Sequence, residues 1–207
     1  MNKLLHIIAT PRGETSSTRK VSDVFLASFR STHPGWSIEE LDLSKEELPS
    51  LTAKRVDGKY VLLGGKDLYG DLREAWQEIV AEIERFLSAD AVLISVPMWN
   101  FGIPYTLKHY IDVIVQPTYL FRYTATGVEG LAMGRKMVVV TSRGGDYSSE
   151  AAKSADFQEP YLRFVFGFTG ITDITFINAE PMNMGEEPAK QALAAAQGKA
   201  RKAAAKI

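Results

Sequence analysis

The regular alternation of short apolar runs with helix-periodic stretches restricts the fold of this 207-residue chain more than any other feature. Most of the runs are continuous and not alternating, which is typical of strands covered on both faces. Strands that alternate with helices form parallel sheets with right-handed crossovers. The sequence therefore predicts an α/β protein. We expect its strands at residues 4–9, 36–43, 91–96, 136–141 and 172–178.

Five strands favour the flavodoxin-like order 2-1-3-4-5, with helices on both faces and a ligand at the carboxyl ends of the strands. The last helix, rich in alanine and lysine, is expected to face the surface. Residues 48–70 are polar and glycine-rich without a clear period, and we expect a long loop near the site. Helices are expected after the first loop through residue 29, and at 71–88, 104–115, 157–168 and 187–206.

Composition limits the partners and the chemistry. The length suits one domain over residues 1–207, and the 24 basic residues nearly balance the 25 acidic ones. The net charge therefore gives no electrostatic attraction to nucleic acid or an anionic membrane, and small molecules are the expected partners. The absence of cysteine excludes disulfides, thiolate nucleophiles and cysteine-ligated metal sites. No stretch has membrane-spanning length and the first apolar run is short for a signal peptide, so we expect a cytoplasmic protein.

The loop after the first strand carries a cluster of hydroxyl groups at the start of a helix. Thr10 ends the strand, and Ser16, Ser17 and Thr18 open the helix. Free backbone N–H groups, the positive helix end and the hydroxyls together suit a phosphate group. A plain N-cap would also explain one of these hydroxyls. Neither a Gly-x-Gly-x-x-Gly motif nor a P-loop lysine is present, which argues against a dinucleotide or nucleoside triphosphate here.

The loop after the third strand is bracketed by Pro97 and Pro104. Between them lie Met98, Trp99, Asn100, Phe101, Gly102 and Ile103. An aromatic ring, a methionine and an amide in a rigid loop suit the face and the polar edge of a flat ring such as flavin. A packed aromatic turn with a structural role for the amide is the alternative.

Ser142, Arg143, Gly144 and Gly145 follow the fourth expected strand. The glycine pair lets the backbone approach a ligand closely and direct its N–H groups at carbonyl oxygens of a flat ring. Glycine pairs also occur in ordinary turns. The three histidines lie far apart without metal-ligand spacing, so we expect no metal site and structural roles for them.

Taken together, these loops resemble those of the bacterial FMN-dependent NADH:azoreductases, relatives of the NAD(P)H:quinone reductases. The family pattern is a hydroxyl residue after strand one, Ser-x-Ser at the helix start, Met-[Tyr/Trp]-Asn-Phe after strand three and Ser-Arg-Gly-Gly after strand four. The chain departs from it at Pro11 and Arg12, and Tyr147 stands where some members have histidine. The likeness extends through residues 107–112, 121–124, 129–131, 160–162 and 170–173.

The resemblance implies an FMN-dependent, NADH-using oxidoreductase that reduces quinones and cleaves azo compounds. It further implies one FMN per subunit and a homodimer in which Phe168 reaches toward the partner's flavin. NADH is favoured over NADPH because no arginine cluster awaits a second phosphate. The cofactor-binding residues are expected to be Thr10, Ser16, Ser17, Thr18, Met98, Trp99, Asn100, Phe101, Ser142, Arg143, Gly144 and Gly145.

No side chain is required as an acid or base, because the flavin carries the redox chemistry. Backbone N–H groups of residues 98–101 and 144–145 are expected to stabilise charge on the ring, and Asn100 to orient its edge. If one open face of the ring serves donor and acceptor in turn, the kinetics are ping-pong. The alternatives are a flavodoxin-type carrier of single electrons and an FMN-binding module without turnover.

Overall fold

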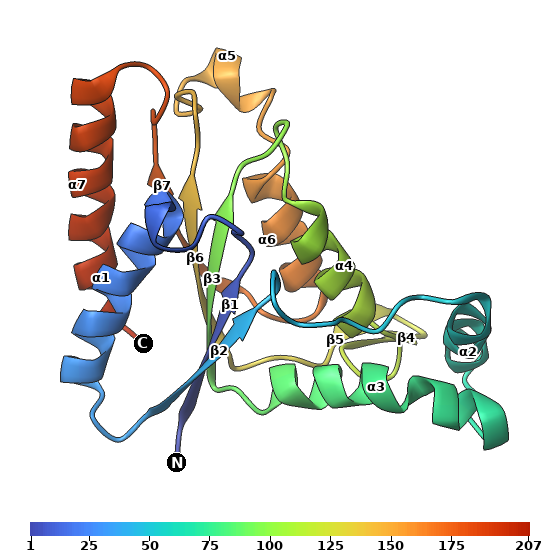
Figure 1. Ribbon diagram of the computed structural model, residues 1–207. Helices are drawn as coiled ribbons and strands as arrows, with labels where there is room; N and C mark the ends of the chain where they lie inside the picture. The colour runs from blue at the N-terminus through green and yellow to red at the C-terminus, as the bar shows by residue number, and fades with distance from the viewer.

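The computed structural model describes residues 1–207 and consists of a parallel five-stranded sheet between two layers of helices (Figure 1). The sheet order is β2-β1-β3-β6-β7, and every neighbouring pair is parallel. β1, β3 and β6 occupy the centre and are almost entirely buried, as their continuous apolar sequences require. The strands are β1 (Lys3–Ile8), β2 (Ser37–Asp42), β3 (Ala91–Pro97), β6 (Lys136–Ser142) and β7 (Asp173–Ala179).

A hairpin that the sequence did not predict changes the numbering of this sheet. β4 (Phe121–Thr124) and β5 (Gly127–Gly130) pair antiparallel with each other and form a separate two-stranded sheet. The observed order therefore reads 2-1-3-6-7, and the strands expected as fourth and fifth are β6 and β7. Each hairpin strand has only four residues, too few for a periodic signal.

α1 (Ser17–Thr32) and α7 (Glu186–Ala204) cover one face of the sheet and pack on each other (Figure 1). α7 does not simply face the surface, because one stripe of it is buried. Alanines four residues apart form that stripe, which allows the two helices to approach closely. The stripe consists of Ala192, Ala196, Ala200 and Ala204.

The opposite face carries α3 (Gly70–Leu87), α4 (Tyr105–Ile114) and α6 (Glu159–Phe168). The larger of the two hydrophobic clusters lies here, between these helices and the sheet. Within it the rings of Phe86 and Phe166 stack with their centroids 6.3 Å apart. None of the helices combines the length and the hydropathy of a membrane-crossing segment.

The expectation of a long loop over residues 48–70 is wrong, because α2 (Ala53–Leu63) forms within it and packs on α3. The sequence did not predict this helix because it contains Gly58, and glycine lowers helix propensity. The tertiary structure requires glycine at this position, because a Cβ at residue 58 would lie 2.2 Å from Nε1 of Trp76. The same indole nitrogen donates to the carbonyl oxygen of Arg55 at 2.9 Å. Two shorter elements, η1 (Gly13–Thr15) and α5 (Glu150–Lys153), complete the chain.

Candidate functional site

The carboxyl ends of the strands enclose a cavity of about 420 Å³. Parallel strands present all their carboxyl ends at one edge, so loops far apart in sequence meet there. Four loops contribute, those after β1, β3, β6 and β7. Lining the cavity are Thr10, Arg12, Ser16, Ser17, Pro97, Met98, Trp99, Ser142, Arg143, Gly144, Met182 and Asn183.

The hydroxyl cluster divides into structural and free groups. Ser16 is the N-cap of α1: its Oγ accepts from the Arg19 amide at 3.3 Å and from Thr10 Oγ1 at 3.1 Å. Thr18 is fully buried, does not line the cavity, and shares a 2.6 Å hydrogen bond with Oγ of Ser142. Capping is therefore the role of Ser16 in this chain. Of the three hydroxyls that open the helix, only that of Ser17 is half-buried, lines the cavity and makes no hydrogen bond within the chain.

The helix start presents further donors to the same space. The first turn of α1 leaves the amides of Ser17 and Thr18 without carbonyl partners in the helix, and the positive end of the helix dipole coincides with them. Arg12 is exposed, lines the cavity and forms no ion pair. In the sequence, Arg12 stands out only as a departure from the family pattern. This end of the cavity is suited to an anionic group.

The loop after β3 forms a tight two-residue turn. Trp99 and Gly102 exchange both backbone hydrogen bonds, each 3.0 Å long, and Asn100 and Phe101 between them have φ values of 48° and 68°. Positive φ at both central positions defines a type I′ turn, where phenylalanine is unusual. The carbonyl oxygen of Phe101 accepts from the amide of Phe157 at 3.0 Å, which anchors the turn. Strained backbone of this kind is typical of functional sites.

This turn also decides which amides are free. The amide of Met98 donates to the Ser142 carbonyl at 2.9 Å, and that of Trp99 is used in the turn. Of the four amides expected to face a ligand here, only those of Asn100 and Phe101 make no hydrogen bond within the chain. Both residues are exposed beside the cavity and do not line it.

Arg143 lines the cavity, but its guanidinium group is committed to the protein. It is 2 % exposed, and its Nη1 lies 2.9 Å from Asp156 and 3.6 Å from Glu180. Nη2 lies 3.6 Å from Glu159, and Nε donates to Gln158 at 3.1 Å. The buried side chain thus joins the loop after β6 to the start of α6 and the end of β7. Its backbone is also used, since its amide donates to the Ala179 carbonyl at 3.0 Å and its carbonyl accepts from the Met182 amide at 2.9 Å.

The glycine pair after Arg143 keeps its amides free. Neither the Gly144 nor the Gly145 amide makes a hydrogen bond within the chain, and only Gly144 lines the cavity. Asn183 packs over this loop: its amide donates to the Gly144 carbonyl at 2.9 Å, and a Cβ at Gly144 would lie 2.9 Å from its Nδ2. Asn183 and Met182 were missed because they belong to no motif. Their position after the carboxyl end of β7 is the signal that would have found them.

The histidines lie away from the cavity. His6 is buried against Ser95, His33 stacks on Phe29 with centroids 4.5 Å apart, and Nε2 of His109 lies 3.1 Å from the Pro49 carbonyl oxygen. Tyr147 places its ring 5.8 Å from the Arg143 guanidinium and does not line the cavity. No histidine is positioned for proton transfer there.

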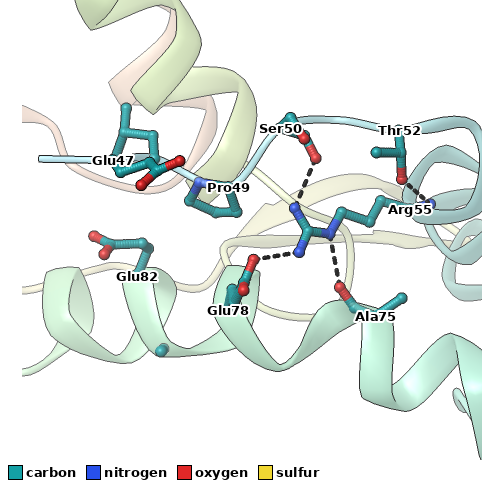
Figure 2. A pocket seen from close by; sticks show the side chains of 10 residues that line it. Glu47, Pro49, Ser50, Thr52, Arg55, Ala75, Glu78 and Glu82 are labelled. Atoms are coloured by element: carbon teal, nitrogen blue, oxygen red, sulfur yellow. Dashed lines mark hydrogen bonds and ion pairs between the residues drawn. The ribbon is translucent and has the colours of Figure 1, made fainter.

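A larger cavity, of about 750 Å³, lies between the segment before α2 and α3 (Figure 2). Arg55 is held by the carbonyl oxygens of Ser50 and Ala75, at 2.8 and 2.7 Å, and by Glu78. Glu47 and Glu82 add two further carboxylates to the walls, and burial raises the pKa of Glu82. An anionic ligand would meet repulsion here, so this cavity does not suit a phosphate-bearing cofactor.

The cavity at the strand ends does suit one. Its volume falls in the range of about 300–1,000 Å³ that small-molecule sites occupy. One end offers a free hydroxyl, two free amides and an arginine without a partner, while the other offers unpaired amides beside aromatic side chains. A molecule with a phosphate at one end and a flat polar ring at the other, as in FMN, matches this distribution of donors.

Comparisons with known proteins show what this chain is similar to. The family model described as having a flavodoxin-like fold matches residues 2–204. An FMN-dependent NADH:quinone oxidoreductase of Ruegeria pomeroyi is 40 % identical over 190 residues, 91 % of this chain and 93 % of that protein. The crystal structure of an azoreductase from Bacillus anthracis superposes over the full length of both chains with a TM-score of 0.90 and 32 % identity. An FMN-dependent NADH-azoreductase of the same species in complex with FMN gives a TM-score of 0.88 and 28 % identity, covering 100 % of this chain and 99 % of that one.

Proposed function

Because this chain belongs to the family with the flavodoxin-like fold, we propose that residues 1–207 act as one FMN-binding domain whose flavin site is the cavity at the strand ends. The protein is an FMN-dependent oxidoreductase that takes electrons from NADH and reduces quinones and azo compounds. The observation that carries this assignment to the cavity is its pairing of an anion-binding helix end with free amides beside aromatic side chains.

The phosphate of FMN belongs at the start of α1. Ser17 supplies its hydroxyl and amide, Thr18 its amide and Arg12 a positive charge. Thr10 and Ser16 act from behind, since their mutual hydrogen bond and the cap hold the turn in shape. The side chains of Thr10, Ser16 and Thr18, all expected to bind the cofactor, therefore contribute mainly by holding the backbone of this turn in place.

The flavin ring belongs between the other two loops. Met98 and Trp99 line the wall, and the type I′ turn holds Asn100 and Phe101 at its edge. The amides of Gly144 and Gly145, which make no hydrogen bond within the chain, would donate to carbonyl oxygens of the ring, while Ser142 and the buried Arg143 hold that loop in place.

FMN, when bound, supplies the chemistry: it accepts hydride from NADH and passes two electrons to the acceptor. The protein orients the reactants and supplies backbone dipoles, and no histidine lines the cavity. We propose that the loops would cover one face of the bound ring, so that donor and acceptor would use the remaining face in turn, which is a ping-pong order. Initial rates over a grid of NADH and quinone concentrations should then give parallel double-reciprocal lines, whereas intersecting lines would refute the order.

A homodimer completes the site. Four aromatic residues of the loop after β3, of α4 and of the α6 region expose more than half of their surface, and large exposed apolar side chains often mark a contact with another subunit. Phe168, which by family resemblance reaches the partner's flavin, packs on Phe121 with centroids 4.7 Å apart. Sedimentation at micromolar concentration should give a dimer, and a fully active monomer would contradict this proposal. The exposed residues are Phe101, Tyr105, Phe157 and Phe164.

We place the protein in the cytoplasm, where NADH is available as the donor.

The single test of the site is Ser17→Asp, which sets a carboxylate against the phosphate dianion. FMN content after purification should fall sharply, while Ser31→Asp near the other end of the same helix should retain FMN. Full FMN content and unchanged affinity in Ser17→Asp would mean that the phosphate binds elsewhere.

A further inference from the structure

The interface between α1 and the sheet changes character along its length. Along the C-terminal half of α1 the contacts are apolar, with Phe25 and Phe29 packed on the sheet near Leu4. Near the N-terminal end of α1, three fully buried polar side chains take the place of these apolar contacts. These are His6 of β1, Ser95 of β3 and Ser22 of α1.

These side chains belong to a closed ring of polar contacts, which we call the polar clamp: Arg19, Glu40, His6, Ser95 and Ser22. Nη2 of Arg19 lies 3.2 Å from Oε2 of Glu40, whose Oε1 lies 3.6 Å from Nδ1 of His6. At that distance Nδ1 makes no hydrogen bond, so this link is a polar contact alone. Nε2 of His6 lies 2.7 Å from Oγ of Ser95, and that oxygen lies 2.5 Å from Oγ of Ser22. The ring leaves α1 at Arg19, crosses β2, β1 and β3, and returns to α1 one turn later.

Stability alone does not account for this arrangement. Buried polar groups cost free energy unless each is bonded, and apolar residues of similar volume would pack at least as well. The order Glu40, His6, Ser95 has the composition of a hydrolytic triad, but Ser95 is 0 % exposed and no substrate reaches it. What the clamp provides is direction, because hydrogen bonds define the height and rotation of a helix where apolar contacts allow it to slide.

The position of the clamp on α1 indicates what is being held. Arg19 lies in the first turn of the helix and Ser22 in the second, and Ser22 Oγ also lies 3.1 Å from the Thr18 carbonyl oxygen. Thr18 in turn is bonded to Ser142 at the end of β6. The amides of Ser17 and Thr18 therefore sit on a turn that is fixed to four strands of the sheet.

We propose that the polar clamp is the positioning device of the phosphate subsite, setting the free amides at the start of α1 at the height where they meet the phosphate of FMN. The inference rests on the proposed function, which places the phosphate there. His6, Ser95 and Ser22 touch no ligand and act through the helix, so they are positioning residues. Their effect is confined to the phosphate end of the cofactor.

Riboflavin, which lacks the phosphate, isolates this effect. Dissociation constants of FMN and riboflavin are measured by flavin fluorescence with the protein stripped of cofactor. Ser22→Ala and Ser95→Ala should raise the FMN constant roughly three- to tenfold, the change expected for a net hydrogen bond, and leave the riboflavin constant within about twofold. Glu40→Gln, a substitution of similar shape at a side chain that is 42 % exposed, tests the clamp without opening a cavity in the core and should lower the FMN preference in the same direction.

Leu26→Ala is the matched control, since it removes buried packing from the same helix outside the clamp. It should lower the melting temperature without changing the ratio of the two constants. Equal weakening of both flavins in the clamp variants, or an unchanged ratio in Glu40→Gln and Ser22→Ala together, would overturn the inference while the phosphate site stands. A wild-type protein that binds both flavins equally would overturn the phosphate site and the clamp with it.

Discussion

Nη1 of Arg143 lies 2.9 Å from Oδ2 of Asp156, in a buried ion pair that ties the loop after β6 to the start of α6. Glu159 and Glu180 lie within 3.6 Å of the same guanidinium group. One arginine thus serves three carboxylates beside the candidate flavin site. The rigidity of the glycine pair that follows depends on this contact.

Arg143→Met should therefore destabilise the fold and the site together. Removing one partner of a buried ion pair leaves uncompensated charge and costs about 3–5 kcal/mol. Thermal unfolding followed by circular dichroism measures the loss. Arg122→Met is the control, because Arg122 pairs with Glu129 at the surface, where the two side chains are 58 % and 38 % exposed, and its loss should leave the melting temperature nearly unchanged. Equal melting temperatures for the Arg143 variant and the wild type would show that the three carboxylates do not need the arginine.

Phe101→Gly should stabilise the protein and impair it as an enzyme. A left-handed conformation costs a residue with a side chain roughly 1–2 kcal/mol, and glycine adopts it freely. The melting temperature of the protein without cofactor should rise, while NADH:quinone turnover falls because the ring at the edge of the cavity is gone. Asn100→Gly should give a smaller gain, since asparagine tolerates this conformation better. A lower melting temperature for Phe101→Gly would mean that its side-chain contacts outweigh the backbone strain.

Arg12→Gln should weaken FMN about tenfold and leave riboflavin unaffected, because a hydrogen bond to a charged phosphate is worth more than a neutral one. Arg30→Gln, at the far end of α1, is the matched control and should change neither. Raising the ionic strength should narrow the difference between Arg12→Gln and the wild type, since Arg12 is exposed. Equal losses for both flavins would place Arg12 elsewhere in the mechanism.

His6 should make the stability depend on pH in the mildly acid range. Burial is the main cause that lowers the pKa of His6 below its ordinary value of 6.5, against the neighbouring carboxylates of Glu40 and Asp23 and together with the charge of Arg19. The unfolded chain then binds the proton first, so the free energy of unfolding decreases as pH falls below 6.5 and levels off below the folded pKa. Melting temperatures from pH 8 to pH 5 measure this slope.

His6→Gln should remove this part of the slope, and His33→Gln, which alters a half-buried ring on the far end of α1, should retain it. A second decline belongs to Glu40, whose contact with His6 and whose attraction to Arg19 lower its pKa to about 2. Its contribution is complete above pH 4.5 and is lost between pH 4.5 and 2. An unaltered slope between pH 6.5 and 5 in His6→Gln would assign that decline to other groups.

The sequence by itself determined the parallel sheet and the edge at which the site lies. Continuous apolar runs such as those of β1, β3 and β6 depend only on burial of the strand on both faces, so composition within seven residues reveals them. The hydroxyl, aromatic and glycine loops follow these strands directly. Their convergence is a consequence of parallel topology, which the alternation of elements already implies.

The tertiary structure alone decided what each of those residues does. Arg143 was expected to bind the cofactor, yet its guanidinium is held by carboxylates 13 to 37 positions away, which no local pattern connects. Phe101 adopts a conformation that its own preference opposes, and α2 forms through a glycine that Trp76 requires. Asn183 enters the cavity only because β7 lies beside β6. Local preferences are set by neighbours in the chain, whereas ion pairs, strained turns and close approaches are set by neighbours in space, and their energies outweigh those preferences.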